Sequence, residues 1–283
     1  MSAPPAPKEV AVPKVARLLL LPFVVLAASM AAQPTPIPLP STSSAPPTSM
    51  AALGDSITRA LAVCCSNGDN SLHSWSTGHV PGDGVSSHYE RLTGLDPAIT
   101  GRNHNNAISG SRARDLPDQA ELAVKQNVEY VTILIGANDL CASSAATMTS
   151  EEEFSFHIKT ALATLNSGLP RARIFVSSIP DLHQLWKTLE NNAEARKAWS
   201  SGTCPSMLSA DNTEEQRQSV IKRELAFNQI LARACSQYRN CRWDNNAVYN
   251  FKFSASDVSV LDYFHPSLEG QASLAELTWR ASW

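Results

Sequence analysis

The stretch Met50-Ala51-Ala52-Leu53-Gly54-Asp55-Ser56 joins a short apolar run to a turn followed by an alanine-rich segment. The apolar run predicts a β-strand that ends at Gly54, with a helix start just beyond it. A serine between a strand end and a helix start has an exposed hydroxyl, and its amide points into an anion-friendly environment. We therefore expect Ser56 to be a covalent nucleophile for acyl transfer.

Downstream, apolar stretches alternate with helical patterns, which is typical of an α/β domain with a doubly wound parallel sheet. The expected strands are residues 50–53, 106–108, 130–135 and 173–179. The third is almost continuous Val, Ile and Leu, as in a strand covered on both faces. The expected helices are residues 87–95, 115–126, 151–165 and 267–279, with Ser150 and Glu153 as a capping box before the third.

The composition of the chain is that of a folded protein with one sizeable core. Of 283 residues, 43% are hydrophobic and 17% are charged, so one catalytic domain is expected. The formal net charge of −3 leaves no basic excess to attract a phosphate backbone, which argues against nucleic-acid binding.

The N-terminus has the pattern of an export signal. Three basic residues precede the apolar run 18–28, and small residues follow it. The run is shorter than the roughly 20 residues that cross a bilayer and contains Pro22, which disfavours a membrane anchor. We expect residues 1–32 to be a signal peptide and the protein to be secreted. The basic residues are Lys8, Lys14 and Arg17.

Residues 33–49 are rich in Pro, Ser and Thr, a composition that predicts a linker or stalk. The catalytic domain is then expected over residues 50–283.

The cysteine content fits an oxidising compartment. Six cysteines allow up to three disulfides in fifteen pairings, with free buried thiols as the alternative. No CxxC pair and no HxxxH pattern accompany them, so neither a zinc site nor any other metal or cofactor is expected. The cysteines are Cys64, Cys65, Cys141, Cys204, Cys235 and Cys241.

Three further polar blocks follow Ser56 in a fixed order. They are residues 105–110 (NNAISG), residues 136–139 (GAND) and residues 262–266 (DYFHP). Each block falls at the end of an expected strand or in the loop beyond it. Open α/β sheets bind ligands at that edge, so the blocks are expected to converge with Ser56.

With these four blocks, residues 50–283 resemble the secreted SGNH or GDSL hydrolases. The match is strongest to bacterial, actinobacterial-type lipases and esterases and to the phospholipase B-like branch, through residues 135–141 (IGANDLC) and 264–267 (FHPS). Ile57 stands where the family name has leucine. The resemblance implies a flavodoxin-like three-layer α/β/α sandwich with a parallel sheet.

The resemblance also implies roles for individual residues. Ser56 attacks the ester carbonyl, His265 accepts and later returns its proton, and Asp262 orients the imidazole. The oxyanion hole consists of the Ser56 amide, the Gly110 amide and the Asn138 side chain. A second aspartate, Asp257, leaves the identity of the triad acid open.

Other conspicuous side chains receive structural interpretations. Asp55 and Asp139 are expected to cap backbone amides. The more polar stretch 182–219, with Trp186 and Trp199, is interpreted as an insertion that either covers an acyl pocket or simply packs. The histidines outside the motifs are expected on the surface or in packing, namely His73, His79, His88, His104, His157 and His183.

The sequence thus predicts a monomeric secreted serine hydrolase of lipid or short-chain acyl esters, with transient contact to a lipid surface. Two other functions fit the same pattern. One is a carbohydrate O-deacetylase, because the fold does not distinguish acyl donors, and the other is a non-catalytic surface-binding protein.

Overall fold

The computed structural model describes residues 1–3, 5, 11 and 45–283. The expected signal peptide, and the expected linker up to residue 44, therefore lie outside the described residues, apart from five isolated positions. All described helices and strands belong to the unit Pro40–Trp283. Among the described residues, none of the helices has the length and apolar composition that a membrane crossing requires.

Five parallel strands form one sheet, in the order β2-β1-β3-β4-β5. This is the flavodoxin-like order, in which the chain reverses direction across the sheet between β1 and β3. The predicted α/β class with a parallel sheet is therefore confirmed. The strands are β1 Met50–Gly54, β2 Asn103–Asn105, β3 Tyr130–Leu134, β4 Arg173–Val176 and β5 Cys241–Trp243.

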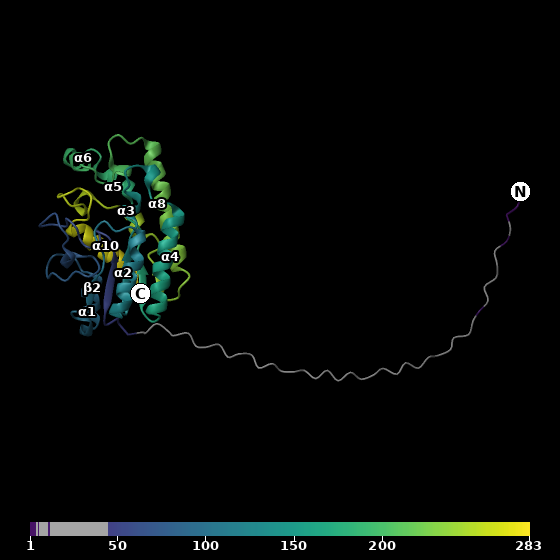
Figure 1. Cartoon of the computed structure of the whole chain (residues 1–283), viewed down its shortest axis with the longest axis horizontal. Helices are drawn as coiled ribbons and strands as arrows, with labels where there is room; N and C mark the ends of the chain where they lie inside the picture. Colours follow the sequence, from purple (N-terminus) through teal and green to yellow (C-terminus); the bar gives the residue numbers. More distant parts are fainter. Residues whose placement is uncertain (4, 6–10, 12–44) are drawn as a thin grey trace. The chain divides into compact units, whose positions relative to one another are not determined.

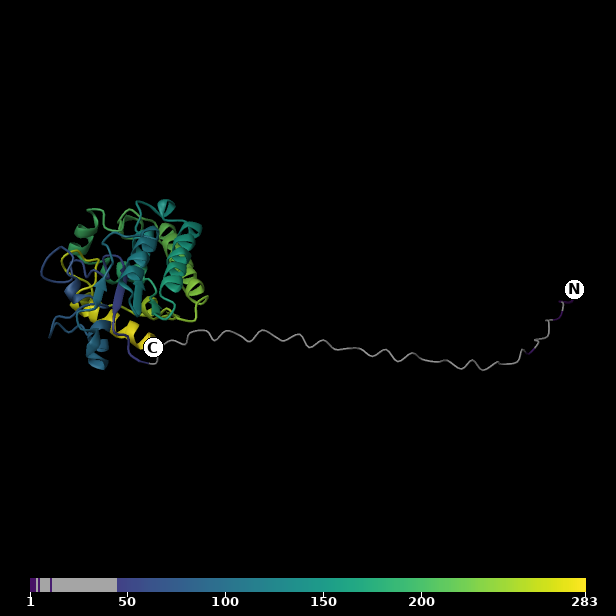
Figure 2. The same cartoon turned by 60° about the horizontal axis from the view of Figure 1, so that its bottom comes forward.

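Helices cover both faces of the sheet, which gives the three expected layers (Figures 1 and 2). On one face lie α1 (His88–Leu95) and α10 (Leu268–Ala281), whose Tyr89, Leu92 and Trp279 pack with sheet residues such as Phe175. The larger helices on the other face are α2 Leu116–Gln126, α4 Glu151–Gly168 and α8 Glu214–Cys235.

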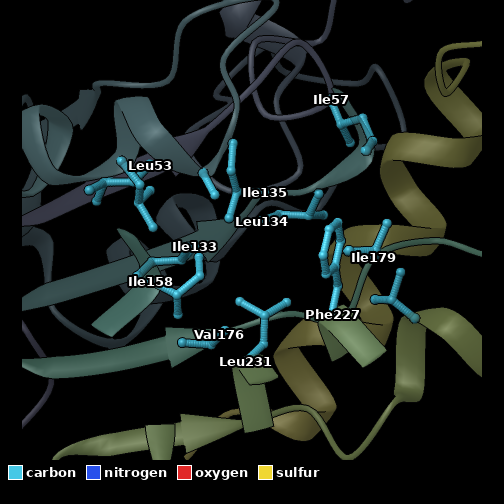
Figure 3. Close-up of a cluster of buried hydrophobic side chains, with 14 of the residues drawn as sticks. Leu53, Ile57, Ile133, Leu134, Ile135, Ile158, Val176, Ile179, Phe227 and Leu231 are labelled. Carbon is cyan, nitrogen blue, oxygen red and sulfur yellow. The ribbon is translucent and has the colours of Figure 1, made fainter. Parts of the chain in front are cut away.

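The core between the sheet and the larger helices follows the two-residue period of the strands (Figure 3). Leu53, Ile133 and Val176 are at most 1% exposed. They lie in the same cluster as Phe154 of α4 and Phe227 of α8, whose rings stack with centroids 3.8 Å apart. This packing makes the central strands a rigid base for the loops at their carboxyl ends.

Short elements complete the domain. The remaining α-helices are α3 Ala137–Leu140, α5 Leu182–Leu189, α6 Ala193–Trp199, α7 Pro205–Leu208 and α9 Ala247–Asn250. The 3₁₀ helices are η1 Ser71–His73, η2 Pro97–Ile99, η3 Ala113–Asp115, η4 Ala145–Thr147 and η5 Ala255–Asp257.

Several predicted boundaries differ from the structure. The second strand is Asn103–Asn105 rather than 106–108, because an edge strand half-exposed to solvent needs no apolar residues. The strand Cys241–Trp243 was not predicted at all. Strands β3 and β4 end at Leu134 and Val176, a few residues earlier than the apolar runs. At α4, Ser150 accepts from the Glu153 amide, but the return bond of a capping box is absent there.

The last residues of the expected linker pack against the domain. Pro47 and Ser49 are buried, the Thr48 amide donates to Glu129 Oε2 (2.7 Å), and Ser49 Oγ accepts from the Glu129 amide (3.1 Å). Residues 45–49 thus extend the folded domain N-terminally of the boundary expected at residue 50.

The structure resolves the cysteine pairing that the sequence left open. Disulfides join Cys64 to Cys65, Cys141 to Cys204, and Cys235 to Cys241. The second bridge follows α3 directly.

Candidate active site

Strand β1 ends in a close approach to β3 that requires glycine. Gly54 has a φ of +148°, and a Cβ at this position would lie 2.2 Å from the Leu134 carbonyl oxygen. The chain then turns, so that Ser56 lies just beyond the carboxyl end of the central strand and is 6% exposed. The nucleophile candidate is therefore placed at the switch point of the sheet, where α/β folds bind ligands.

Two buried glutamines fix this turn, and the sequence analysis missed both. Gln119 of α2 accepts from the Gly54 amide (2.7 Å) and donates to the Gly54 carbonyl (3.0 Å). Gln271 of α10 donates to the Ile57 carbonyl (2.9 Å). Both glutamines are at most 3% exposed. The sequence signal that could have revealed them is a polar residue on the apolar, buried face of an amphipathic helix.

The structure brings Ser56, His265 and Asp262 together in one hydrogen-bonded chain. His265 Nε2 lies 2.8 Å from Ser56 Oγ, and His265 Nδ1 lies 2.6 Å from Asp262 Oδ2. With Nδ1 protonated and held by the carboxylate, Nε2 has its lone pair free to accept the serine proton. The arrangement can therefore transfer a proton from Ser56 to His265 during attack on a carbonyl.

Asp262 is held as a carboxylate. Burial raises the pKa of its carboxyl group, but the hydrogen bond and charge of His265 and the amides of Phe264 and His265 outweigh this and leave the pKa below its usual value. Those amides donate to Asp262 Oδ1 at 2.9 and 3.0 Å. Asp257, the alternative acid, instead accepts from Ser254, which precedes η5, and from Ser273 within α10.

The three donors expected for the oxyanion lie at the ends of three adjacent strands. Asn138 Nδ2 donates one hydrogen to the Ser111 carbonyl (3.0 Å), which orients the amide and leaves its second hydrogen for a ligand. Within residues 45–283, neither the Ser56 nor the Gly110 amide donates to another described residue. Gly110 has a φ of +84°, is exposed, and has nothing within 4 Å of the position that a Cβ would take.

Two buried carboxyl groups lie directly beneath this site. Asp55 Oδ1 accepts from the Ile57 amide (2.9 Å), and Asp139 Oδ2 accepts from the Ala113 amide (2.9 Å), so the expected amide-capping roles are confirmed. The second oxygen of each group has no partner among the described residues. Burial raises the pKa of Asp55 to about 7 and that of Asp139 to about 6.

An apolar cavity of about 60 Å³ adjoins the site. Its wall includes Ile57, which follows Ser56, and Ala137, which precedes Asn138. Phe264 and Pro266 on either side of His265 complete this part of the lining. This apolar lining suits a small apolar ligand group.

Two of the histidines outside the motifs make defined structural contacts. His88 is fully buried between Tyr130 and Thr278, and burial lowers its pKa to about 3. His73 pairs with Asp83 at 2.7 Å.

His73 also belongs to a cluster with Cys64 and Cys65, in which the three ligand-type atoms lie within 4.8 Å of one another. The two sulfur atoms are bonded to each other, so neither is a thiolate that could hold a metal ion.

Sequence comparison places this geometry among known hydrolases. A family model described as GDSL-like lipase/acylhydrolase matches residues 50–278. The chain is 27% identical to human membrane-associated phospholipase B1 over 272 residues. That alignment covers 81% of this chain but 18% of the human protein, so the chain spans less than a fifth of this relative's length.

Solved structures of similar fold include two esterolytic enzymes. Axe2, an acetylxylan esterase from Geobacillus stearothermophilus, has a TM-score of 0.51 at 14% identity, over 85% of this chain and 96% of Axe2. Lipase Lip_vut3 from a goat rumen metagenome has a TM-score of 0.51 at 15% identity, over 82% of this chain and 96% of the lipase. At these identities the likeness concerns the fold.

Proposed function

The chain belongs to the GDSL-like lipase/acylhydrolase family, and on that premise we propose that it hydrolyses carboxylic esters with Ser56 as nucleophile, His265 as general base and acid, and Asp262 as its orienting carboxylate. The observation that carries the proposal is the hydrogen-bonded chain from Ser56 Oγ through both ring nitrogens of His265 to Asp262. A serine hydroxyl is a poor nucleophile without such a base.

The reaction proceeds in two halves. Ser56 Oγ bonds to the ester carbonyl carbon while its proton moves to His265 Nε2, and the carbonyl oxygen becomes an oxyanion. The intermediate then collapses, and the leaving alkoxide takes the proton from His265. Water repeats the sequence on the acyl-enzyme and releases the carboxylic acid. Asp262 stabilises the imidazolium in both halves.

The oxyanion is proposed to be bound by the amides of Ser56 and Gly110 and by the Asn138 side chain. Two observations support this assignment: both backbone amides are unpaired within the described domain, and Asn138 is oriented by Ser111. Preorganised donors of this kind stabilise the charge that develops in the transition state.

The substrate class we propose is a lipid or short-chain acyl ester. The apolar lining of the cavity beside the site supports an acyl substrate. Ile108, Val260 and Leu261, which are 61%, 72% and 42% exposed, belong to the loops of Gly110 and His265. These exposed apolar side chains support transient contact with a lipid surface.

We further propose that residues 1–32 are an export signal, that the protein is secreted, and that the folded hydrolase acts as a monomer. The basic residues and apolar run of the N-terminus carry the export proposal. Secretion is tested by N-terminal sequencing of protein recovered from culture medium, and full-length protein retained in the cell contradicts it.

A fluorophosphonate probe tests the nucleophile. We expect wild-type protein to be labelled on Ser56 and Ser56→Ala to remain unlabelled although folded. Folded wild-type protein that resists labelling overturns the proposal in favour of a binding role.

A panel of p-nitrophenyl esters, assayed beside acetylated xylan, tests the substrate class. We expect turnover to be higher with acyl chains of four or more carbons than with acetyl. Release of acetate from xylan alone would assign the protein as a carbohydrate deacetylase.

A further inference from the structure

The segment with α6 and α7 touches the proposed site from two directions. At one end, Trp199 of α6 donates through its indole N–H to the Tyr263 carbonyl (2.9 Å). Tyr263 lies between Asp262 and His265, and its φ of +56° is an uncommon conformation for an aromatic residue. Trp199 is 3% exposed, so its hydrogen bond is shielded from water.

At the other end, α7 is attached to the turn that carries Asn138. Ser206 donates from its hydroxyl to the Leu140 carbonyl (2.6 Å) and from its amide to the Ala142 carbonyl (3.0 Å). The disulfide from Cys141 to Cys204 adds a covalent connection beside these bonds. The last residue of α3 is thus tied directly to α7.

The segment is itself fixed to the body of the domain. Arg217 of α8 donates to the carbonyls of Met207, Ser209 and Asn212 at 3.1, 2.7 and 2.7 Å. Its guanidinium lies 4.0 Å from the centroid of the Trp186 ring of α5. A segment held by a buried arginine, a disulfide and a buried indole bond is suited to fix its neighbours rather than to open and close.

We propose that residues 193–208 form a positioning clamp that sets the His265 loop against the Asn138 turn. Trp199 is the positioning residue for the His265 loop. Ser206, together with the Cys141–Cys204 bridge, positions the Asn138 turn. This proposal rests on the proposed function, because it assigns the clamp to the alignment of the same proton-transfer and oxyanion groups. Of the two interpretations of residues 182–219, it favours packing over a cover for an acyl pocket.

The two arms act on different chemical groups. Loss of the Trp199 hydrogen bond frees the Tyr263 peptide and loosens the contact between Asp262 and His265. The imidazolium then loses part of its stabilisation, whereas the interaction of the Asp55 carboxyl group with His265 is untouched. Loss of the Ser206 hydroxyl instead displaces α3, and with it the amide of Asn138.

The test compares Trp199→Phe with Trp283→Phe, which removes the same N–H group from an exposed indole that forms no hydrogen bond among the described residues. We expect Trp199→Phe to lower kcat about tenfold with little change in KM, since misplacement affects the chemical step more than binding. The acidic limb of its kcat/KM profile moves to lower pH. Trp283→Phe retains the wild-type profile.

Ser206→Ala tests the second arm. We expect kcat to fall by a similar factor while the acidic limb stays in place, because the oxyanion donor and not the base is displaced. Active-site titration with the fluorophosphonate normalises every rate to folded enzyme, and the position of the pH limb does not depend on the amount that folds.

The clamp proposal is overturned if Trp199→Phe has the kcat and pH profile of the wild-type protein. It is also overturned if the acidic limb of the kcat/KM profile shifts equally in all three variants. Failure of wild-type protein to react with the probe overturns the proposed function instead, so the two failures are distinguishable.

Discussion

The two halves of the proposed site are built in opposite ways. Ser56 follows β1, a central strand whose five residues are all buried; all five pair with β3 and the first three also pair with β2. His265 and Asp262 lie in loop 258–266, which has no helix or strand and a single isolated bridge between its ends. The nucleophile is therefore placed by the core of the fold, and the base by a few local hydrogen bonds.

Because of this difference, we expect substitutions in the two regions to affect stability and catalysis separately. Changes at the end of β1 disturb the packing between β1 and β3, whereas changes in loop 258–266 leave the sheet intact.

Removal of the imidazole is expected to abolish the chemistry without unfolding the protein. His265→Ala should reduce kcat by about 10⁴-fold or more, because the serine loses its base. Ester hydrolysis and circular dichroism measure the two effects. His157→Ala on α4 is the control and keeps wild-type turnover. Substantial activity in His265→Ala would show that the loop does not supply the base.

The opposite result is expected at the strand end. Gly54→Ala places a methyl group 2.2 Å from the Leu134 oxygen at a φ of +148°, which should cost about 3 kcal/mol or more of unfolding free energy. Urea denaturation measures it. Gly82→Ala, with a φ of +80° and nothing within 4 Å, isolates the backbone cost alone. Equal losses in both variants contradict the proposed clash.

Asn138 follows the end of a strand, but its proposed role is in the oxyanion hole. We expect Asn138→Ala to lower kcat by about 10²- to 10³-fold and to change the thermal melting temperature little. Its only observed side-chain bond is to the Ser111 carbonyl, so the fold loses one contact. Near-normal turnover in this variant would remove Asn138 from the oxyanion hole.

The pH dependence of the unfolding free energy tests the role of Asp55, the buried residue next to Ser56. Burial raises the pKa of Asp55 from 3.8 to about 7, so the folded protein binds this proton more tightly than the unfolded chain does. The contribution of Asp55 to stability is therefore greatest at low pH and is lost as the pH rises from about 4 to about 7.

Asp55→Asn removes that loss while keeping the acceptor for the Ile57 amide. Relative to the variant, wild-type protein should lose about 2 kcal/mol more of unfolding free energy between pH 5 and pH 7. Urea denaturation at both pH values tests this. Parallel changes in the two proteins would mean that Asp55 is ionised in the folded state throughout.

The same contrast explains what the sequence could predict. The run from Met50 to Leu53 is apolar because it is buried on both faces, and Gly54 marks its end. The contact of Asp262 with His265 follows from a spacing of three residues. Such features are local, so the printed sequence contains them directly.

The features that escaped prediction depend on the edges of the sheet and on distant contacts. Strands β2 and β5 are edge strands, and Asn103-His104-Asn105 has no apolar residue to reveal it. The bond from Trp199 to Tyr263 joins residues 64 positions apart, and the Gln119 bonds to Gly54 span 65. Neither the hydrophobic pattern of a sequence nor its secondary-structure propensities indicate which distant residues form such pairs.

Asp262 accepts from both the ring and the amide of His265, so the base and its orienting carboxylate are linked within one loop. The contact between His265 and Ser56 spans 209 positions of sequence and connects this loop to the end of β1. Displacement of the whole loop would therefore separate the base from the nucleophile and stop the proton transfer.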